Sequence, residues 1–259
     1  MQTKFVLITG ASSGIGLALA ERFAQTKYNL ILVARNAEKL KEIEIHLSKK
    51  YTIHVVSISQ DLGEPKAFEK IFSIVQEKNI TVDILVNNAG LGNYGNFSET
   101  DLKTEQEMMQ VNMVALTELT KVFLPGMQER NYGKILNVAS TAGFQPGPFM
   151  AVYFASKAYV LSFSEALDEE LKNSNIQVSV LCPGPTSTNF QKRAFHRDEF
   201  FFGTTMDVDT VADICFKQFL EGKRIIIPGL KNTLLAWSTR LLPRSMVTQV
   251  MAKMMKRKD

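Results

Sequence analysis

Over residues 5–16 the chain reads FVLITGASSGIG, a short apolar run followed at once by a glycine-rich turn. The run from Phe5 to Thr9 is too continuous for a strand with one solvated face, so it predicts a strand buried in a parallel sheet. A helix is expected directly after the turn, because apolar residues follow at helical spacing: Ile15, Leu19, Ala20 and Phe23. Strand, turn and helix in this order favour a phosphate-binding site, since the N–H groups and dipole of a helix N-terminus attract negative charge.

The turn itself contains the residue types that such a site needs. Glycine permits a tight turn and a close approach of the backbone to a pyrophosphate, and serine adds a hydroxyl donor. We therefore expect a dinucleotide to be held by Gly10, Ser12, Ser13, Gly14, Ile15 and Gly16. The alternative is a turn whose glycines serve only the backbone geometry, and the flanking strand and helix argue against it.

Six further apolar, β-branched runs follow, at residues 30–34, 53–58, 82–86, 134–138, 177–181 and 224–227. Segments of helical period separate them, with apolar stripes at residues 68–75 and 160–171. Alternating strands and helices predict βαβ crossovers, and nothing divides the chain into two domains. The predicted fold class is α/β: a single doubly wound Rossmann domain of about seven parallel strands with helices on both faces. Residues 183–205 have no clear period and are expected to form a long loop over the site.

Composition narrows the function classes. The 259 residues are 45% hydrophobic and 22% charged, which excludes a disordered chain and a disulfide scaffold. Cys182 and Cys215 lie in apolar runs, so we expect reduced, structural thiols, and no metal site is expected from the scattered histidines. The N-terminus lacks a signal-peptide pattern, and no run reaches the roughly 18 apolar residues of a membrane span. We expect a cytoplasmic protein.

The positive charge is concentrated at the end of the chain. Residues 231–259 hold 7 Lys or Arg and 1 Asp, whereas residues 1–230 hold 23 basic and 25 acidic residues, a net of −2. A nucleic-acid partner is therefore not expected. In the tail, Pro243 predicts two short helices instead of one. Such a basic amphipathic stretch either makes peripheral contact with anionic lipid or packs within the molecule or against another subunit.

The second predicted strand ends in Ala34-Arg35-Asn36. In dinucleotide folds an acidic residue near this strand end binds the ribose 2′-hydroxyl of NAD(H), whereas an arginine holds the 2′-phosphate of NADP(H). Arg35 therefore favours NADP(H) over NAD(H), unless it only opens the next helix at the surface. Asp61 and Leu62 follow the third strand, where the Asp61 carboxylate either accepts a hydrogen bond from adenine or caps a helix.

Tyr153 and Lys157 lie four residues apart, on one face of a predicted helix. A phenol titrates near pH ~10 and is a poor acid–base catalyst at neutral pH unless a cation stabilises the phenolate, a role that Lys157 suits. Ser140 follows the fifth strand at the edge where ligands of such sheets bind, and Asn112 interrupts an apolar helical run. Each has an ordinary alternative: an exposed helix pair, a strand-end serine and a structural asparagine.

Together these residues make the chain resemble the short-chain dehydrogenase/reductase family of the Tyr-x-x-x-Lys type. The resemblance runs from about residue 3 to residue 228 and rests on motifs in a fixed order: Thr9-Gly10-x-x-x-Gly14-x-Gly16, Asn87-Asn88-Ala89-Gly90, Asn112, Ser140, Tyr153-x-x-x-Lys157 and Pro183-Gly184-x-x-x-Thr188. It implies an NAD(P)-binding catalytic domain, which we assign to residues 1–230. Residues 231–259 lie outside the resemblance and form the basic amphipathic tail described above. The resemblance also implies a homo-oligomer, a dimer or tetramer.

The resemblance further implies roles for the site residues. Tyr153 would be the general acid or base, and Lys157 would bind the nicotinamide ribose and lower the tyrosine pKa. Ser140 would hold the substrate oxygen, and Asn112 would support a proton relay through water. The adenosine half of the cofactor would contact Asp61, Asn88, Ala89 and Gly90, and the nicotinamide end Pro183, Gly184, Thr186 and Thr188.

We accordingly expect an NADPH-dependent oxidoreductase that reduces the ketone or aldehyde of an apolar small molecule. The apolar pocket is inferred from residues near the catalytic edge, some of which are alternatively core residues: Phe144, Pro146, Phe149, Phe190, Phe195, Phe200, Phe201 and Phe202. Arg193, His196 and Arg197 would meet an acidic substrate group or form a solvated loop face. The alternative functions are a 3-oxoacyl thioester reductase and a non-catalytic, cofactor-bound sensor or scaffold.

Overall fold

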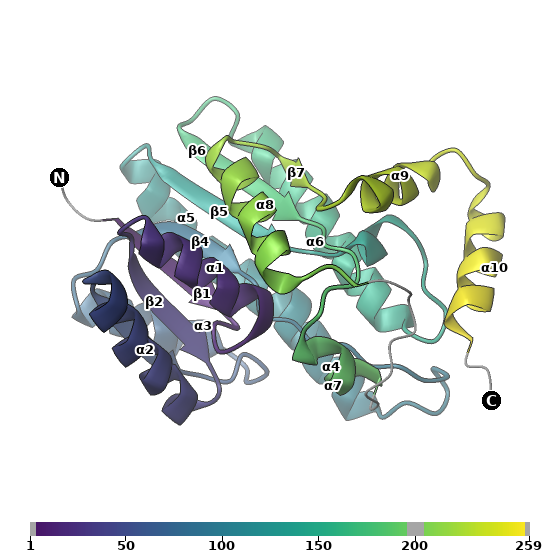
Figure 1. Cartoon of the computed structure of the whole chain (residues 1–259), viewed down its shortest axis with the longest axis horizontal. Coiled ribbons are helices and arrows are strands. Elements are labelled where there is room, and N and C mark those ends of the chain that lie inside the picture. Colours follow the sequence, from purple (N-terminus) through teal and green to yellow (C-terminus); the bar gives the residue numbers. More distant parts are fainter. Residues whose placement is uncertain (1–3, 196–204, 257–259) are drawn as a thin grey trace.

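The computed structural model describes residues 4–195 and 205–256. A seven-stranded sheet forms its centre, in the order β3-β2-β1-β4-β5-β6-β7 (Figure 1). All neighbouring strands are parallel, which confirms the predicted α/β Rossmann-type fold. The strands are β1 Phe5–Thr9, β2 Asn29–Ala34, β3 Val55–Ser59, β4 Val82–Asn87, β5 Gly133–Val138, β6 Ile176–Leu181 and β7 Ile225–Ile226.

Helices cover both faces of this sheet. They are α1 Gly14–Gln25, α2 Ala37–Tyr51, α3 Ala67–Glu77, α4 Leu102–Met109, α5 Ala115–Glu129, α6 Ala151–Glu170, α7 Asn189–Phe195, α8 Val208–Leu220, α9 Leu230–Ser238 and α10 Arg244–Met255. One apolar core packs α1, α2 and α8 against the sheet, and a second packs α3, α5 and α6 against the opposite face. The predicted apolar stripes form these contacts: Leu19 and Phe23 of α1, Ile71 and Val75 of α3, and Leu167 of α6 are buried.

Three predictions of local structure need correction. The strand predicted at residues 53–58 is β3, Val55–Ser59, which begins two residues later and ends one residue later. The strand predicted at residues 224–227 is only Ile225–Ile226, because it lies at the sheet edge and pairs only with Val180 and Leu181 of β6. The stretch expected to be a loop without period contains the helix α7, whose seven residues are too few to reveal a helical pattern. Of the residues predicted there, His196, Arg197, Phe200, Phe201 and Phe202 lie outside the described part of the chain.

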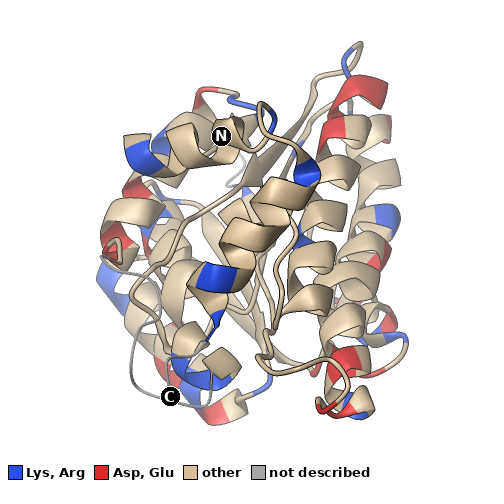
Figure 2. Ribbon diagram, turned by 90° about the vertical axis from the view of Figure 1, so that its right-hand side faces the viewer, with Lys and Arg blue, Asp and Glu red and all other residues tan. Residues whose placement is uncertain are grey.

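The tail folds as two short helices separated at Pro243, as predicted. Both pack on the body of the protein: Ala236, Val247, Met251 and Met255 are buried, and the Tyr94 hydroxyl donates to the Met255 carbonyl at 2.6 Å. Figure 2 turns the side that carries α10 toward the viewer. The alternative that the tail packs within the molecule is therefore correct for the buried sides of these two helices. Within the described residues, the helices are all too short or too polar to cross a bilayer.

Candidate active site

A cavity of about 820 Å³ lies along the carboxyl ends of the strands. Its wall takes residues that follow β1, β2, β4, β5 and β6 in turn, such as Gly10, Arg35, Asn88, Ser140 and Pro183. This is the edge at which ligands of open parallel sheets bind, and the strand order reverses there between β1 and β4. Every predicted site residue lines the cavity except Gly16 and Asn112, which lie behind its wall.

The glycine turn is built for close contacts. Gly10 has a φ of +64°, a conformation that glycine adopts without strain. A Cβ on Gly16 would lie 2.4 Å from Asn88 Nδ2 and 2.5 Å from the Gly10 carbonyl oxygen. Gly16 therefore allows α1 to pack on the turn, and it supports the site without lining it.

The end of β4 fastens this turn. The Asn88 amide donates to the carbonyl oxygens of Thr9 at 2.8 Å and Gly10 at 3.2 Å. The buried Thr9 hydroxyl accepts from the backbone N–H groups of Asn88 and Ala89, both at 3.0 Å, and donates to the Val86 carbonyl at 3.4 Å. β1 and β4 thus share one hydrogen-bonded junction at the wall of the cavity.

Helix α1 leaves its N-terminus available to a ligand. Ser13 precedes the helix in an extended conformation, and its side chain makes no capping hydrogen bond. The first N–H groups of an α-helix have no partner within the helix, and here the residues around them line the cavity: Ser12, Ser13, Gly14 and Ile15. This end of the cavity fits the negative charge of a pyrophosphate.

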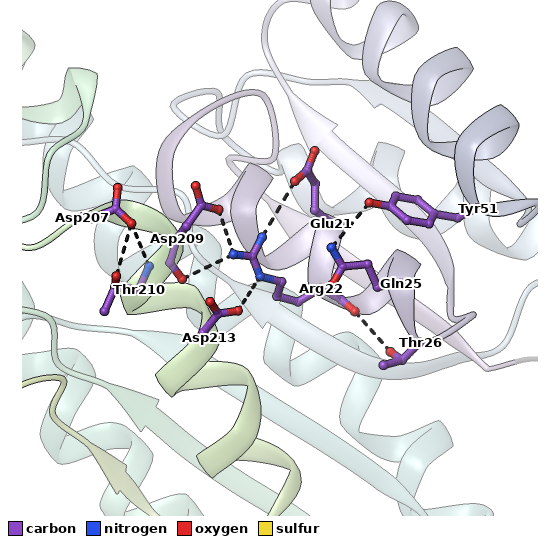
Figure 3. Close-up of polar contacts among 9 residues, drawn as sticks. All are labelled: Glu21, Arg22, Gln25, Thr26, Tyr51, Asp207, Asp209, Thr210 and Asp213. Atoms are coloured by element: carbon purple, nitrogen blue, oxygen red, sulfur yellow. Dashed lines mark hydrogen bonds and ion pairs between the residues drawn. The ribbon is translucent and has the colours of Figure 1, made fainter.

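Arg22 fixes α1 against α8 (Figure 3). Its Nε donates to Asp213 at 2.6 Å, and its Nη2 donates to Asp209 at 2.8 Å. Both carboxylates come from the first two turns of α8, so the guanidinium joins two helices that are far apart in the sequence. The glycine turn is therefore fastened to the end of β4, and the helix that follows it is fixed to α8.

Arg35 lies exposed at the far rim of the cavity. Its Nη1 is 3.4 Å from Glu107 Oε1 of α4 and 3.7 Å from Asp61 Oδ2. Asp61 also accepts from the Gly63 N–H at 2.9 Å, so it stabilises the turn after β3, and the helix that follows is preceded by Lys66 instead. The alternative of Asp61 as a helix cap is therefore wrong. Glu107 was not predicted from the sequence.

At the other end of the cavity, Tyr153 and Lys157 lie one turn apart on α6. The Lys157 ammonium donates to the Val138 carbonyl at 2.9 Å and lies 5.8 Å from the centroid of the Tyr153 ring. Ser140 precedes a single 3₁₀ turn, Thr141–Phe144, and its hydroxyl accepts from the Ala142 N–H at 3.1 Å. The same hydroxyl donates to the Pro183 carbonyl at 3.4 Å and lies near enough to the Tyr153 phenol to lower its pKa. The structure therefore brings three of the four predicted catalytic residues together.

Burial changes how these groups titrate. It raises the pKa of Tyr153 to about 12, and the hydrogen bond with Ser140 opposes that rise. It lowers the pKa of Lys157 to about 8, because a buried ammonium loses its hydration. The expected lowering of the tyrosine pKa by Lys157 is not what this structure shows, since desolvation dominates and the ammonium is bonded to the Val138 carbonyl.

Asn112 is buried in a π-helical turn, Gln110–Val114, between α4 and α5. Its Oδ1 accepts from the Leu91 N–H at 2.8 Å, and its Nδ2 donates to the Leu91 carbonyl at 3.0 Å and to Ser156 Oγ at 2.9 Å. A Cβ on Gly90 would meet both Asn112 Oδ1 at 3.5 Å and Lys157 Nζ at 3.3 Å. Asn112 thus holds the loop after β4 beside Lys157, from behind the wall.

The end of the cavity that holds Tyr153 is largely apolar. Phe190 and Phe195 line it as predicted, and the Phe190 ring lies 5.5 Å from that of Tyr153. Phe144 and Phe149 pack instead against Trp237 and Tyr94, and Pro146 does not line the cavity. Arg193 lines it, whereas the tail contributes wall residues that were not predicted: Lys231, Asn232, Leu235, Ala236, Met251 and Met254.

Known proteins resemble this chain in sequence and in structure. A family model described as short chain dehydrogenase matches residues 4–199. The chain is similar to a very-long-chain 3-oxoacyl-CoA reductase-B of Danio rerio, with 33% identity over 194 residues, or 73% of this chain and 61% of that protein. It is also similar to a probable NADP-dependent dehydrogenase of Haemophilus influenzae, with 34% identity over 201 residues, or 77% of this chain and 78% of that one.

Among solved structures, a short-chain dehydrogenase from Sphingobium yanoikuyae in complex with NADPH superposes with a TM-score of 0.83 at 32% identity. The superposition covers 92% of this chain and 94% of that chain. By contrast, the chain matches only about three fifths of the length of the Danio rerio relative. The likeness in fold therefore extends over nearly the whole chain, while the longer relatives contain segments outside the match.

Proposed function

Since the chain belongs to the short-chain dehydrogenase/reductase family and is thus an oxidoreductase of carbonyl or alcohol compounds, we propose that it reduces the ketone or aldehyde of an apolar substrate with NADPH. The observation that carries the proposal is the convergence of Ser140, Tyr153 and Lys157 at one end of a cavity whose other end is an uncapped helix N-terminus. In this proposal residues 1–230 form the catalytic domain, and residues 231–259 complete its substrate end.

The residues present fit a nicotinamide dinucleotide. The pyrophosphate would lie on the turn from Gly10 to Gly16, the adenosine half beside Asp61, Leu62, Asn88, Ala89 and Gly90, and the nicotinamide end beside Pro183, Gly184, Thr186 and Thr188. All of these except Ala11 and Gly16 of the turn line the same cavity. When bound, NADPH supplies the hydride that the carbonyl carbon receives. The protein's own groups then have to deliver one proton and stabilise the charge that develops on the oxygen.

Tyr153 suits the proton transfer in this direction. Its raised pKa keeps the phenol protonated at neutral pH, so it donates its proton to the oxygen as negative charge develops there. The Ser140 hydroxyl, which lines the same end of the cavity, donates to that oxygen as well. Hydride to carbon and proton to oxygen together give the alcohol.

Lys157 and Asn112 support this step. With a pKa of about 8, the Lys157 side chain is mostly a cation at neutral pH, and we assign it to the ribose hydroxyls next to the nicotinamide. Asn112 positions the loop after β4 against Lys157 through its bonds to Leu91. The water-mediated relay through Asn112 remains part of the proposal.

The preference for NADPH over NADH rests on Arg35. An exposed guanidinium at the adenosine rim can pair with a 2′-phosphate, which NADH lacks. It already faces Asp61 and Glu107, so a phosphate would join or displace these carboxylates. The kcat/KM ratio for NADPH against NADH measures this preference, and Arg35→Ser should lower the ratio.

Tyr153→Phe tests the catalytic assignment. The variant should bind NADPH with the parent's affinity, because the lost hydroxyl is not part of the phosphate or adenosine contacts, yet lose most turnover of an aldehyde and ketone panel. NADPH fluorescence titration and absorbance kinetics give the two readouts. Turnover near that of the parent would refute the role of Tyr153, and absence of NADPH binding by the parent itself would refute the whole proposal.

A 3-oxoacyl thioester is the second candidate substrate, favoured by the likeness to the Danio rerio relative. An acyl thioester assayed beside small ketones separates the two classes. A sensor or scaffold without turnover is disfavoured by the intact Ser140, Tyr153 and Lys157 cluster.

We further propose a cytoplasmic homo-oligomer, whose size light scattering would measure.

A further inference from the structure

The outer sides of α9 and α10 expose many large apolar side chains. Six of them are between 43% and 86% exposed: Leu234, Trp237, Leu241, Met246, Val250 and Met254. On α10, Met246, Val250 and Met254 recur every four residues and form one stripe, while Val247, Met251 and Met255 are buried beside it. The apolar face of α10 is therefore wider than the part of it that contacts the protein. Such a width is expected of a helix that packs against a second apolar neighbour.

The charges on the same helices are all of one sign. The chain has no Asp or Glu between residues 230 and 256, but it has Lys231, Arg240, Arg244, Lys253 and Lys256 there, all of them exposed. The Arg240 guanidinium lies 4.5 Å from the centroid of the Trp237 ring, so cations and apolar groups share one surface. In Figure 2 the helix at the centre of the view is tan and blue, without red.

The cavity opens onto this surface. Leu235 of α9 and Met254 of α10 line the cavity and are themselves more than half exposed. Lys231 lines the cavity as well and is exposed. We take the mouth of the cavity to lie between the two helices, because Met254 belongs both to the cavity wall and to the exposed stripe.

From these three observations we propose that α9 and α10 dock on an anionic bilayer, and that the cavity takes a lipid-dissolved ketone or aldehyde from it. Buried apolar side chains and cations near anionic headgroups both favour such binding. A second copy of the chain is the poorer occupant, because a twofold contact places the same surface on both sides, and cations would then face cations. The substrate half of the proposal rests on the proposed function, whereas the docking half does not.

Vesicle sedimentation of the full chain tests the docking. We expect the protein to pellet with phosphatidylcholine vesicles that contain about 30% phosphatidylglycerol, and much less with phosphatidylcholine alone. Leu234→Glu combined with Val250→Glu should lower the partition coefficient at least tenfold, since it puts one acid on each helix. Neither residue lines the cavity.

Ile45→Glu is the matched control. Ile45 is 57% exposed on α2, on a different part of the surface, so the same substitution should leave pelleting unchanged. Circular dichroism and NADPH titration verify that both variants are folded. Failure of the parent to pellet, or equal loss in the Ile45 control, would overturn the proposal. So would a size-exclusion result in which the double variant only converts a dimer to a monomer.

Kinetics with two substrates tests delivery from the bilayer. The double variant should keep the parent's kcat/KM for a small water-soluble aldehyde and lose at least tenfold for a long-chain ketone carried in anionic vesicles. Equal loss on both substrates would contradict delivery through the mouth. If the parent turns over neither substrate, the proposed function fails while the sedimentation result still decides the docking.

Discussion

Thr9 offers a direct test of how the phosphate turn is held. Its hydroxyl accepts from Asn88 N and Ala89 N and donates to the Val86 carbonyl, at the point where β1 and β4 meet. Thr9→Val keeps the shape of the side chain and removes all three hydrogen bonds. Asn88 N keeps its 3.1 Å contact with the Val86 carbonyl, whereas Ala89 N loses the Thr9 partner.

The expected loss of stability follows from these hydrogen bonds. A buried donor left without a partner costs about 1–3 kcal/mol, and weakening the other two bonds adds to it, so Thr9→Val should destabilise the fold by about 2–3 kcal/mol. Thr9→Ser keeps the hydroxyl and loses one methyl group, for about 1 kcal/mol. Because Asn88 and Ala89 line the cavity, the valine variant should also bind NADPH about tenfold more weakly.

Urea unfolding followed by circular dichroism measures the first effect, and NADPH fluorescence titration measures the second. The serine variant controls for the loss of packing, because the two substitutions differ mainly in which half of the threonine they keep. A valine variant as stable as the serine variant, with parental NADPH affinity, would refute the hydrogen-bonded junction between β1 and β4 as the support of the turn.

Three further predictions concern single residues. The pKa of Lys157 falls from 10.5 to about 8 on folding, so between these pH values the unfolded chain binds more protons than the folded chain. The unfolding free energy of the parent should therefore rise, relative to that of Lys157→Met, by about 2 kcal/mol between about pH 8 and about pH 10. Urea unfolding measures both free energies, and an equal dependence on pH in the two proteins would contradict this prediction. Glu107→Gln frees Arg35 from one carboxylate, so the KM for NADPH should fall about twofold to fivefold with the KM for NADH unchanged; equal changes would exclude a role at the 2′-phosphate. Gly16→Ala should lower stability by about 1–3 kcal/mol in thermal unfolding, because its Cβ would meet the Asn88 amide and the Gly10 carbonyl oxygen. Gly126→Ala in α5 should not, because its Cβ would meet only the flexible end of Arg130.

The strands were predictable because a buried parallel strand is a continuous apolar run, a signal that depends only on neighbours in the sequence. β4 begins at Val82 as predicted and extends one residue further, to Asn87. β7 was predicted too long, because its pairing with β6, and not its composition, sets its length. The helix α7 gave no signal in seven residues.

The residues of the site were predictable where their spacing is local. Tyr153 and Lys157 are one turn apart on any helix, and the turn residues are contiguous. Glu107 was beyond reach, since the fold brings it to Arg35 across 72 positions of sequence. The titration of Tyr153 was also beyond reach, because the direction of its pKa depends on burial that only the packing of the cavity determines.

The two cations at the ends of the cavity differ in how they can act. Lys157 is 4% exposed and bonded to a backbone carbonyl, so dissolved salt screens it weakly and its main cost is lost hydration. Arg35 is exposed and faces two carboxylates, so its attraction for a phosphate is weakened by both salt and its own partners. Under the proposed function, the choice between NADPH and NADH should therefore be the salt-sensitive part of binding, while the alignment of the reacting end should not be. The positive excess of the chain lies in the tail beyond residue 230, and among the described residues of that tail Lys231 is the one cation that lines the cavity.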